Sequence, residues 1–269
     1  MIRSGLGVAL MLTVLALPAQ RRREAQTPPP PAPPSATSQQ GAPAQRLATQ
    51  AEALYNLAVK YGDPSIALLA LYHRITDKPN DLALRDSLMG LYYALGFYTQ
   101  ALNVINDLKD SKYENLRTLE VEALSFRALN RLKESLEAYE KLYAKAPSLF
   151  TQYQIATLQY QLKRVAECAL TLQQIQQNPK ASEEKVVITL GENQQEEVIL
   201  LAAAQNIQGV VLLEQKEYAA AKTAFEKALQ TAPNFQLAKQ NLQVVERQMK
   251  QPAVGETPPA NTPRPAAGR

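Results

Sequence analysis

The segment GVVLLEQKEYAAAKTAFEKALQTAP runs from Gly209 to Pro233 and contains many alanines but few large apolar side chains. A helix packs by burying an apolar stripe, and alanine covers little area. We interpret Gly209 and Ala221 as small positions that let two helices approach closely, while Phe225 and Leu212 fill the adjoining groove. The segment therefore predicts a pair of packed helices that ends at Pro233, because proline cannot continue a helix.

The same pattern recurs along the chain. Small residues recur at spacings of 34, 34, 33 and 53 residues, and four positions after each one stands a large, mainly apolar residue. In the last three units a second compact residue precedes the small position by twelve residues, and a proline closes four of the units. The small positions are Ala67, Ala101, Ser135, Cys168 and Ala221, the large ones are Leu71, Ile105, Tyr139, Leu172 and Phe225, the second compact residues are Ala123, Ala156 and Gly209, and the prolines are Pro79, Pro147, Pro179 and Pro233.

This periodicity resembles the tetratricopeptide repeat (TPR), a unit of about 34 residues with two antiparallel helices, small residues at their crossing and a closing proline. The resemblance implies an all-α, right-handed superhelical solenoid of about five helix-turn-helix repeats plus a C-terminal capping helix, in which stacked units bury each other's faces. It is clearest in the last unit, at Gly209, Leu212, Tyr218, Ala221, Phe225, Ala228 and Pro233.

The expected domain organisation follows from this register. Two proline-rich segments, 20–46 and 251–269, are expected to be a disordered linker and a disordered tail. Between them, residues 47–250 form the predicted TPR domain, whose capping helix at 236–250 follows Asn234, a residue suited to cap a helix N-terminus. The repeats are expected at about 48–81, 82–115, 116–148, 149–181 and 202–235.

The longest spacing leaves an insertion at 182–201. Val186 to Thr189 is a β-branched run, Gly191 to Gln195 is typical of a turn, and Glu196 to Leu200 supplies a second run, so we predict a β-hairpin. One interpretation is a recognition arm or an edge that accepts a partner strand. The alternative is a decorated loop that packs on the neighbouring helices.

Residues 1–19 join a basic start at Arg3 to an apolar run from Leu6 to Ala19, which is typical of a secretory signal peptide. As a helix this run spans about 21 Å, less than the ~30 Å of a hydrocarbon layer. We therefore expect a periplasmic or secreted protein. The alternative is a membrane anchor formed by residues 6–19, which the basic residues Arg21 to Arg23 favour because positive charge resists translocation.

Composition and reactive residues argue against other functional classes. Acidic and basic residues are interspersed despite the net charge of +4, without the basic stripe that nucleic-acid binding requires. An enzyme needs converging acids, bases, nucleophiles or metal ligands. His73 is the sole histidine, and the sole cysteine, Cys168, occupies one of the small positions, as expected of a structural thiol. We predict a protein that is not an enzyme and needs no metal or cofactor.

The resemblance places a binding surface in the concave groove formed by the first helices, where the family usually binds extended peptides. The expected lining is mixed in charge and rich in tyrosine, which supplies contact area with a polar tip, and Arg127 and Lys60 are suited to hold a carboxylate. We therefore predict a scaffold or adaptor for a protein or peptide of unknown identity. The expected lining is Glu52, Asn56, Lys60, Asp86, Tyr93, Arg117, Glu120, Arg127, Phe150, Tyr153, Tyr160 and Asn206.

A second function is compatible with the same residues. In a ligand-binding module of the cell envelope, groove tyrosines stack on a sugar ring or a similar small molecule. That function requires the rings of Tyr93, Tyr153 and Tyr160 to be exposed around a pocket.

Overall fold

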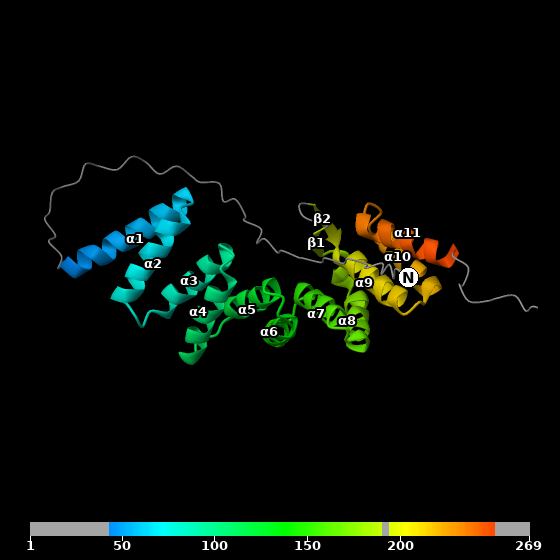
Figure 1. Cartoon of the computed structure of the whole chain (residues 1–269), viewed down its shortest axis with the longest axis horizontal. Coiled ribbons are helices and arrows are strands. Elements are labelled where there is room, and N and C mark those ends of the chain that lie inside the picture. The colour runs from blue at the N-terminus through cyan, green and yellow to red at the C-terminus, as the bar shows by residue number, and fades with distance from the viewer. Residues whose placement is uncertain (1–42, 190–193, 251–269) are drawn as a thin grey trace, which may run out of the picture. The chain divides into compact units, whose positions relative to one another are not determined.

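The computed structural model describes residues 43–189 and 194–250 (Figure 1). The expected signal segment at 1–19, residues 20–42 of the expected linker, the tail at 251–269 and most of the expected turn after β1 lie outside these ranges, while residues 43–46 are helical. In order, the elements are α1 (Pro43–Tyr61), α2 (Pro64–Asp77), α3 (Leu82–Ala94), α4 (Tyr98–Asp110), α5 (Leu116–Ala128), α6 (Leu132–Lys145), α7 (Leu149–Gln161), α8 (Val165–Gln177), the 3-10 helix η1 (Pro179–Ser182), β1 (Lys185–Thr189), β2 (Gln195–Ile199), α9 (Leu200–Glu214), α10 (Tyr218–Thr231) and α11 (Gln236–Lys250).

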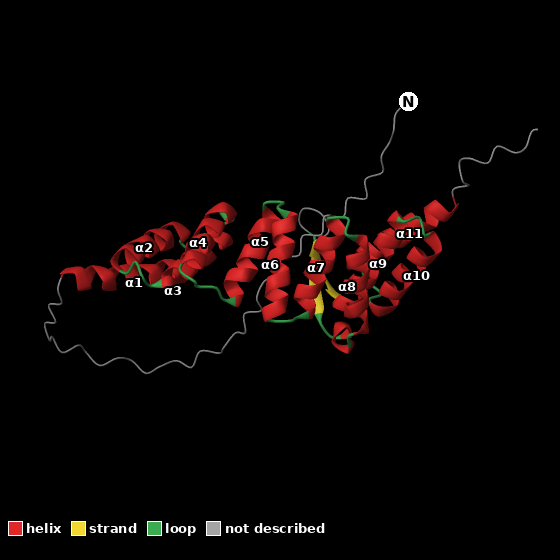
Figure 2. Cartoon of the chain, turned by 90° about the horizontal axis from the view of Figure 1, so that it is seen from below, coloured by secondary structure: helices red, strands yellow, loops and turns green. Residues whose placement is uncertain are grey.

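The predicted all-α fold class is confirmed, because the helices pack in consecutive pairs: α1 on α2, α3 on α4, α5 on α6, and α9 on α10 (Figure 2). The described helices up to Ile175 belong to one compact unit, here the N-terminal unit, and Gln176 onward belongs to a second, the C-terminal unit. Among the described residues, none of the helices combines the length and the apolarity needed to cross a bilayer.

The turn inside each helix pair closes in the same way. After the left-handed residue of the turn, the next backbone N–H donates to the carbonyl five residues earlier, as in Glu217 N to Leu212 O at 2.9 Å. This is the bond of a Schellman C-cap, which satisfies a carbonyl that the helix end leaves free. The left-handed residues are Gly62, Gly96, Asn130, Lys163 and Lys216, with φ between 57° and 77°.

Three first helices begin with a side-chain cap. Asp81 accepts from Ala83 N at the start of α3, and Ser148 Oγ accepts from Thr151 N at the start of α7, both at 3.1 Å. Asn115 begins α5 with a capping box, in which its Oδ1 accepts from Thr118 N at 2.8 Å. Such caps stabilise a helix start by about 1 kcal/mol each, and here they fix where the first helix of a pair begins.

The five small positions occupy equivalent places, because each is the fourth residue of a second helix and each is buried. Ser135 Oγ donates to Ala123 O at 2.8 Å, and Cys168 Sγ donates to Ala156 O at 3.3 Å, so these residues join their helix to the first helix of the pair. At Gly209 an added Cβ would lie 2.5 Å from the ring of Phe225. The Phe225 ring therefore occupies the space that a side chain at position 209 would need.

The predicted hairpin is present, with β1 and β2 antiparallel and Val186 opposite Val198. The side chains of Val186, Ile188 and Val198 are buried, and both strands contact α9. This burial agrees with the alternative interpretation of a segment packed on its neighbouring helix.

Glu196 in β2 corrects one expectation about α11. Both carboxylate oxygens of Glu196 accept from Gln236 N at 3.1 Å, so the helix start receives its negatively charged partner from the hairpin. The capping role that we expected of Asn234 is filled by Glu196. A carboxylate at a helix N-terminus is favourable because it meets unpaired N–H groups and the positive end of the helix dipole.

Candidate functional site

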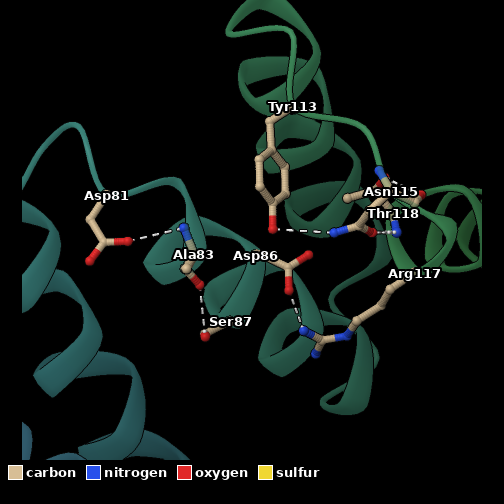
Figure 3. A network of polar contacts seen from close by, with 8 residues as sticks. All are labelled: Asp81, Ala83, Asp86, Ser87, Tyr113, Asn115, Arg117 and Thr118. Carbon is tan, nitrogen blue, oxygen red and sulfur yellow. Dashed lines mark hydrogen bonds and ion pairs between the residues drawn. The ribbon is translucent and has the colours of Figure 1, made fainter.

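An ion pair joins the first helices of the second and third pairs (Figure 3). Arg117 Nη1 on α5 donates to Asp86 Oδ2 on α3 at 2.5 Å. The Arg117 side chain is 52% exposed while that of Asp86 is 13% exposed, so the acid is the anchor and the guanidinium faces outward. The guanidinium also lies against Gly90, where a Cβ would clash with Nη2. The absence of a side chain at Gly90 therefore lets the Arg117 guanidinium pack against α3.

The start of α5 holds Arg117 in place. Arg117 is the second residue of the helix, directly behind the capping box of Asn115 and Thr118. Asn115 Nδ2 also donates to the hydroxyl of Tyr113 at 3.2 Å (Figure 3). These contacts fix the first turn of α5 and with it the backbone that carries Arg117.

Tyr93 and Glu120 lie near each other on the same two helices. Burial raises the pKa of the half-buried Tyr93, and the neighbouring groups Tyr98 and Glu120 raise it further. The rings of Tyr93 and Tyr98 are 5.8 Å apart between centroids at a tilt of 56°. Tyr93 is therefore a neutral phenol at physiological pH, braced by a second ring and next to an exposed carboxylate.

Arg127 is the centre of a polar cluster near the end of α5. Its Nη1 donates to Gln154 Oε1 on α7. Burial lowers the pKa of Arg127, and the nearby hydroxyl-bearing residues Tyr139 and Tyr153 act in the opposite direction. Burial also raises the pKa of both tyrosines, against the influence of Arg127. The cluster therefore contains one cation and two protonated phenols at neutral pH.

The other expected lining residues are placed apart from these contacts. Glu52, Asn56 and Lys60 are exposed on α1, Phe150 is half-buried at the start of α7, and Tyr160 is buried, with Lys163 Nζ 5.1 Å from the centroid of its ring. Asn206 is buried in the C-terminal unit, where it accepts from Asn241 Nδ2 at 2.9 Å. The structure thus brings together Asp86 with Arg117, Tyr93 with Glu120, and Arg127 with Tyr153.

Two of the three tyrosines needed for ring stacking are buried. Tyr153 is 0% exposed and Tyr160 is 6% exposed. Their rings are not available to a stacked sugar or small molecule, so no observation favours that function.

Sequence reasoning did not identify three contributors to these contacts. Gln154 could not be identified because its partner Arg127 is 27 residues away in the sequence. Gly90 could not be identified because it does not occupy one of the recurring small positions of the repeat. Tyr139 was assigned to packing alone. A signal did exist, because among the five large positions only Tyr139 carries a hydroxyl, which packing does not require.

Groups that could hold a metal or act as a nucleophile are few in the described part of the chain. Across residues 43–189 and 194–250, no three His, Cys, Asp or Glu side chains are grouped to hold a metal ion. His73 is exposed on α2, and burial raises the pKa of the Cys168 thiol to about 12, which keeps it protonated. The accessible charged and phenolic groups described above lie on α3 and α5, at Tyr93, Arg117 and Glu120.

Comparison with known proteins identifies the fold. No family model matches the sequence, and no curated protein matches it. Among solved structures, YrrB, a TPR protein with an unusual peptide-binding site, superposes with a TM-score of 0.55 at 13% identity over 69% of this chain and 87% of its own. MamA of Desulfovibrio magneticus RS-1, from residue 41 to its end, superposes with a TM-score of 0.54 at 15% identity over 70% of this chain and 97% of its own. The chain has the TPR fold.

Proposed function

We propose that this protein is a non-catalytic scaffold that binds an extended peptide or protein segment along α3 and α5. The TPR fold is typically a protein-binding scaffold, and the similar fold of YrrB carries a peptide-binding site. The observation that carries the proposal is Arg117, whose half-exposed guanidinium is anchored on Asp86 between the two first helices.

The physical argument rests on preorganisation. Binding costs free energy when a flexible side chain must be ordered, at about 0.5–1.5 kcal/mol for each rotamer-rich residue. Arg117 is already held by its ion pair with Asp86 and by its packing against Gly90. About half of its side chain is still exposed to solvent. Arginine and tyrosine are also the residue types that most often dominate binding energy. Arg117, Tyr93 and Glu120 therefore form the surface that we expect to hold the ligand.

A quantitative binding experiment tests this function. Peptides are selected from a random library on the full-length chain, and their affinity is measured by fluorescence anisotropy for the wild type and for Arg117→Ala. We expect Arg117→Ala to weaken binding by about tenfold, the loss of one anchored contact. The control Lys133→Ala removes an equal charge from an exposed position on α6 and should leave affinity unchanged. Equal affinities for Arg117→Ala and the wild type would contradict the proposal.

Export is proposed separately, from the first nineteen residues alone. Cell fractionation and N-terminal sequencing of the mature protein would test it. A mature chain that begins near residue 20 in the periplasm or medium supports cleavage of a signal peptide. An intact chain in the membrane fraction would support the anchor instead.

A further inference from the structure

The first helix pair carries most of the exposed large apolar residues in the described part of the chain. Those on this pair are Leu54, Leu57, Val59 and Tyr61 on α1 and Leu69 and Tyr72 on α2. The remaining ones lie singly along the chain, at Phe97, Leu116, Leu129, Leu170 and Met249. Single exposed apolar residues are ordinary, whereas a group of them marks an interaction surface.

Three of these residues form a stripe along one side of α1. Leu54, Leu57 and Tyr61 are spaced by three and four positions, which places them on the same face of a helix. They are called the α1 stripe below, and they are 38%, 53% and 72% exposed. Val59 is 57% exposed as well, but it is two positions from both Leu57 and Tyr61 and therefore lies on the opposite side of the helix.

The other repeats show what covers the same positions. In the repeat register, the α1 stripe corresponds to Leu88, Leu91 and Leu95 at α3 and to Ile155, Leu158 and Leu162 at α7. Leu88 and Leu91 belong to one core cluster with Leu71 of α2. Ile155 and Leu158 belong to another with Leu136 of α6. In both cases the covering helix is the second helix of the preceding pair.

The third pair confirms this relationship with polar residues. Glu122 of α5 occupies the position that corresponds to Leu54, and it forms an ion pair with Lys109 of α4, again the second helix of the preceding pair. The side of a first helix that bears the stripe is thus the side on which another helix packs. Within residues 43–189 and 194–250 no helix precedes α1, so its stripe has no such cover.

The last described helix does not offer a surface that matches the stripe. Apart from Met249, the exposed residues of α11 are polar or charged: Gln236, Gln240, Gln243, Arg247 and Lys250. Repeat arrays typically end in a polar capping face of this kind. A head-to-tail contact between α1 of one copy and α11 of the next would therefore place apolar side chains against polar ones. The same stripe on a second copy is the matching surface.

We propose that two copies of this chain pair through their α1 stripes, with α1 antiparallel to α1 of the other copy about a two-fold axis near Leu57. A two-fold contact uses the same patch on both copies, so an apolar patch is its own complement. Leu54 of one copy then lies against Tyr61 of the other. Lys60, whose Nζ lies 5.4 Å from the centroid of the Tyr61 ring, flanks the stripe and stays at the edge of the contact. The inference goes beyond the proposed function, since it does not involve α3 or α5.

The first experiment measures the oligomeric state of the full-length chain by sedimentation velocity over a concentration series. The wild type should form a reversible dimer. Leu57→Glu should raise the dimer dissociation constant at least about tenfold, because it places a charge in an apolar contact. Val59→Glu is the matched control, since it adds the same charge to an equally exposed position on the opposite side of α1, and it should leave the constant unchanged. Circular dichroism shows whether both variants are folded.

Each other outcome would overturn the proposal. A wild type that stays monomeric would show that the stripe does not pair, and equal weakening by Leu57→Glu and Val59→Glu would place the contact elsewhere. An apolar contact should persist in about 1 M NaCl, where contacts between exposed charges are screened. A dimer that dissociates at this salt concentration would therefore contradict pairing through the stripe.

The second experiment tests the antiparallel geometry by cross-linking. A disulfide requires Cα atoms within about 7 Å, which residues on a two-fold axis satisfy and residues on the far side of the helix do not. Mild oxidation should therefore link Leu57→Cys into a covalent dimer and leave Val59→Cys unlinked, while the native Cys168 is buried. Equal linking of the two variants, or none in either, would overturn the geometry. The proposed ligand surface would survive these failures, because it is tested by peptide affinity in Arg117→Ala.

Discussion

The α9–α10 pair and helix α7 show two ways to build the same repeat. The α9–α10 pair is packed with small apolar residues, and the ring of Phe225 occupies the space above Gly209. Helix α7 is buried at every residue from Thr151 to Tyr160, five of which are polar residues other than tyrosine.

The buried glutamines of α7, which are Gln152, Gln154 and Gln159, have hydrogen-bond partners on other helices. Gln152 Nε2 donates to Gln174 Oε1 and Gln159 Oε1 accepts from Thr171 Oγ1, both at 2.8 Å. Gln154 Oε1 accepts from Arg127, but its NH₂ group has no hydrogen-bond partner among residues 43–189 and 194–250. Burial of polar groups is tolerated when they are hydrogen-bonded. The comparison teaches that apolar side chains fill the centre of the α9–α10 pair, whereas α7 also buries polar side chains that hydrogen-bond to other helices.

The largest loss of stability is expected in the α9–α10 pair. Phe225→Ala removes a fully buried ring and leaves a cavity, so unfolding free energy should fall by about 3–5 kcal/mol. Urea denaturation followed by circular dichroism measures the change. Phe97→Ala removes a ring that is 46% exposed and should cost less than about 1 kcal/mol. Equal losses for the two variants would contradict the packing described for Phe225.

Gly209→Ala tests the same contact from the other helix. The new Cβ would lie 2.5 Å from the Phe225 ring, so we expect a loss of about 1–3 kcal/mol from overpacking. In the Phe225→Ala background the clash is gone, and alanine should instead stabilise α9 by up to about 1 kcal/mol through its higher helix propensity. A double-mutant cycle by urea denaturation measures this reversal of sign. The same cost in both backgrounds would show that Gly209 does not make room for the ring.

Substitutions of two glutamines test the hydrogen bonds of α7. Gln154→Leu removes one hydrogen-bond acceptor from the half-buried Arg127 and should destabilise the protein by about 1–3 kcal/mol. Gln159→Leu should change stability by less than about 1 kcal/mol, because the single hydroxyl proton of Thr171 can be donated instead to Glu167 O at 3.0 Å. Thermal and urea denaturation of both variants measure the difference. If Gln159→Leu were the more damaging change, the roles given to the two side chains would be wrong.

The burial of Cys168 should make the stability of the protein depend on pH. Its pKa is raised from about 8.5 in an unfolded chain to about 12 in the fold. Between these values the unfolded state loses the thiol proton and the folded state keeps it, so stability should fall as pH rises, by at most about 1.4 kcal/mol per pH unit. Urea denaturation of the wild type and of Cys168→Ala between pH values of about 8 and 10 compares the slopes. Identical slopes would contradict the raised pKa.

The smallest expected effect concerns the turn of the α9–α10 pair. Lys216 has a φ of 64°, a conformation that costs an L-residue about 1 kcal/mol or more and costs glycine almost nothing. Lys216→Gly should therefore stabilise the protein by up to about 1 kcal/mol after the greater freedom of unfolded glycine is deducted. Lys216→Ala is the control, since alanine relieves no strain. A gain for alanine equal to that for glycine would assign the effect to the lost charge.

The sequence was sufficient for features set by local periodicity. The helix pairs follow from recurring small and large residues at Ala67, Ala101, Ser135, Cys168 and Ala221, and the hairpin follows from the β-branched run at Val186 to Thr189. Each of these patterns lies within a single repeat or hairpin, where the spacing of side chains along the sequence determines which face of a helix or strand they occupy.

Contacts between distant residues could not be read in the same way. Glu196 caps α11 across 40 positions, and Arg127 meets Gln154 across 27 positions. Neither pair has a spacing that distinguishes it from surface charge or from the polar residues of an ordinary helix. The expected lining was accordingly placed by register alone, which located Arg117 and Asp86 on facing helices but did not say which of the tyrosines, such as Tyr153, would be buried.

The central claim is that α3 and α5 form the ligand surface of this scaffold. A crystal structure of the full-length chain with a selected peptide tests it most directly. The claim predicts a peptide that lies across both first helices and contacts Arg117 and Tyr93. A peptide bound on the second helices α4 and α6, with Arg117 still paired only to Asp86, would contradict it.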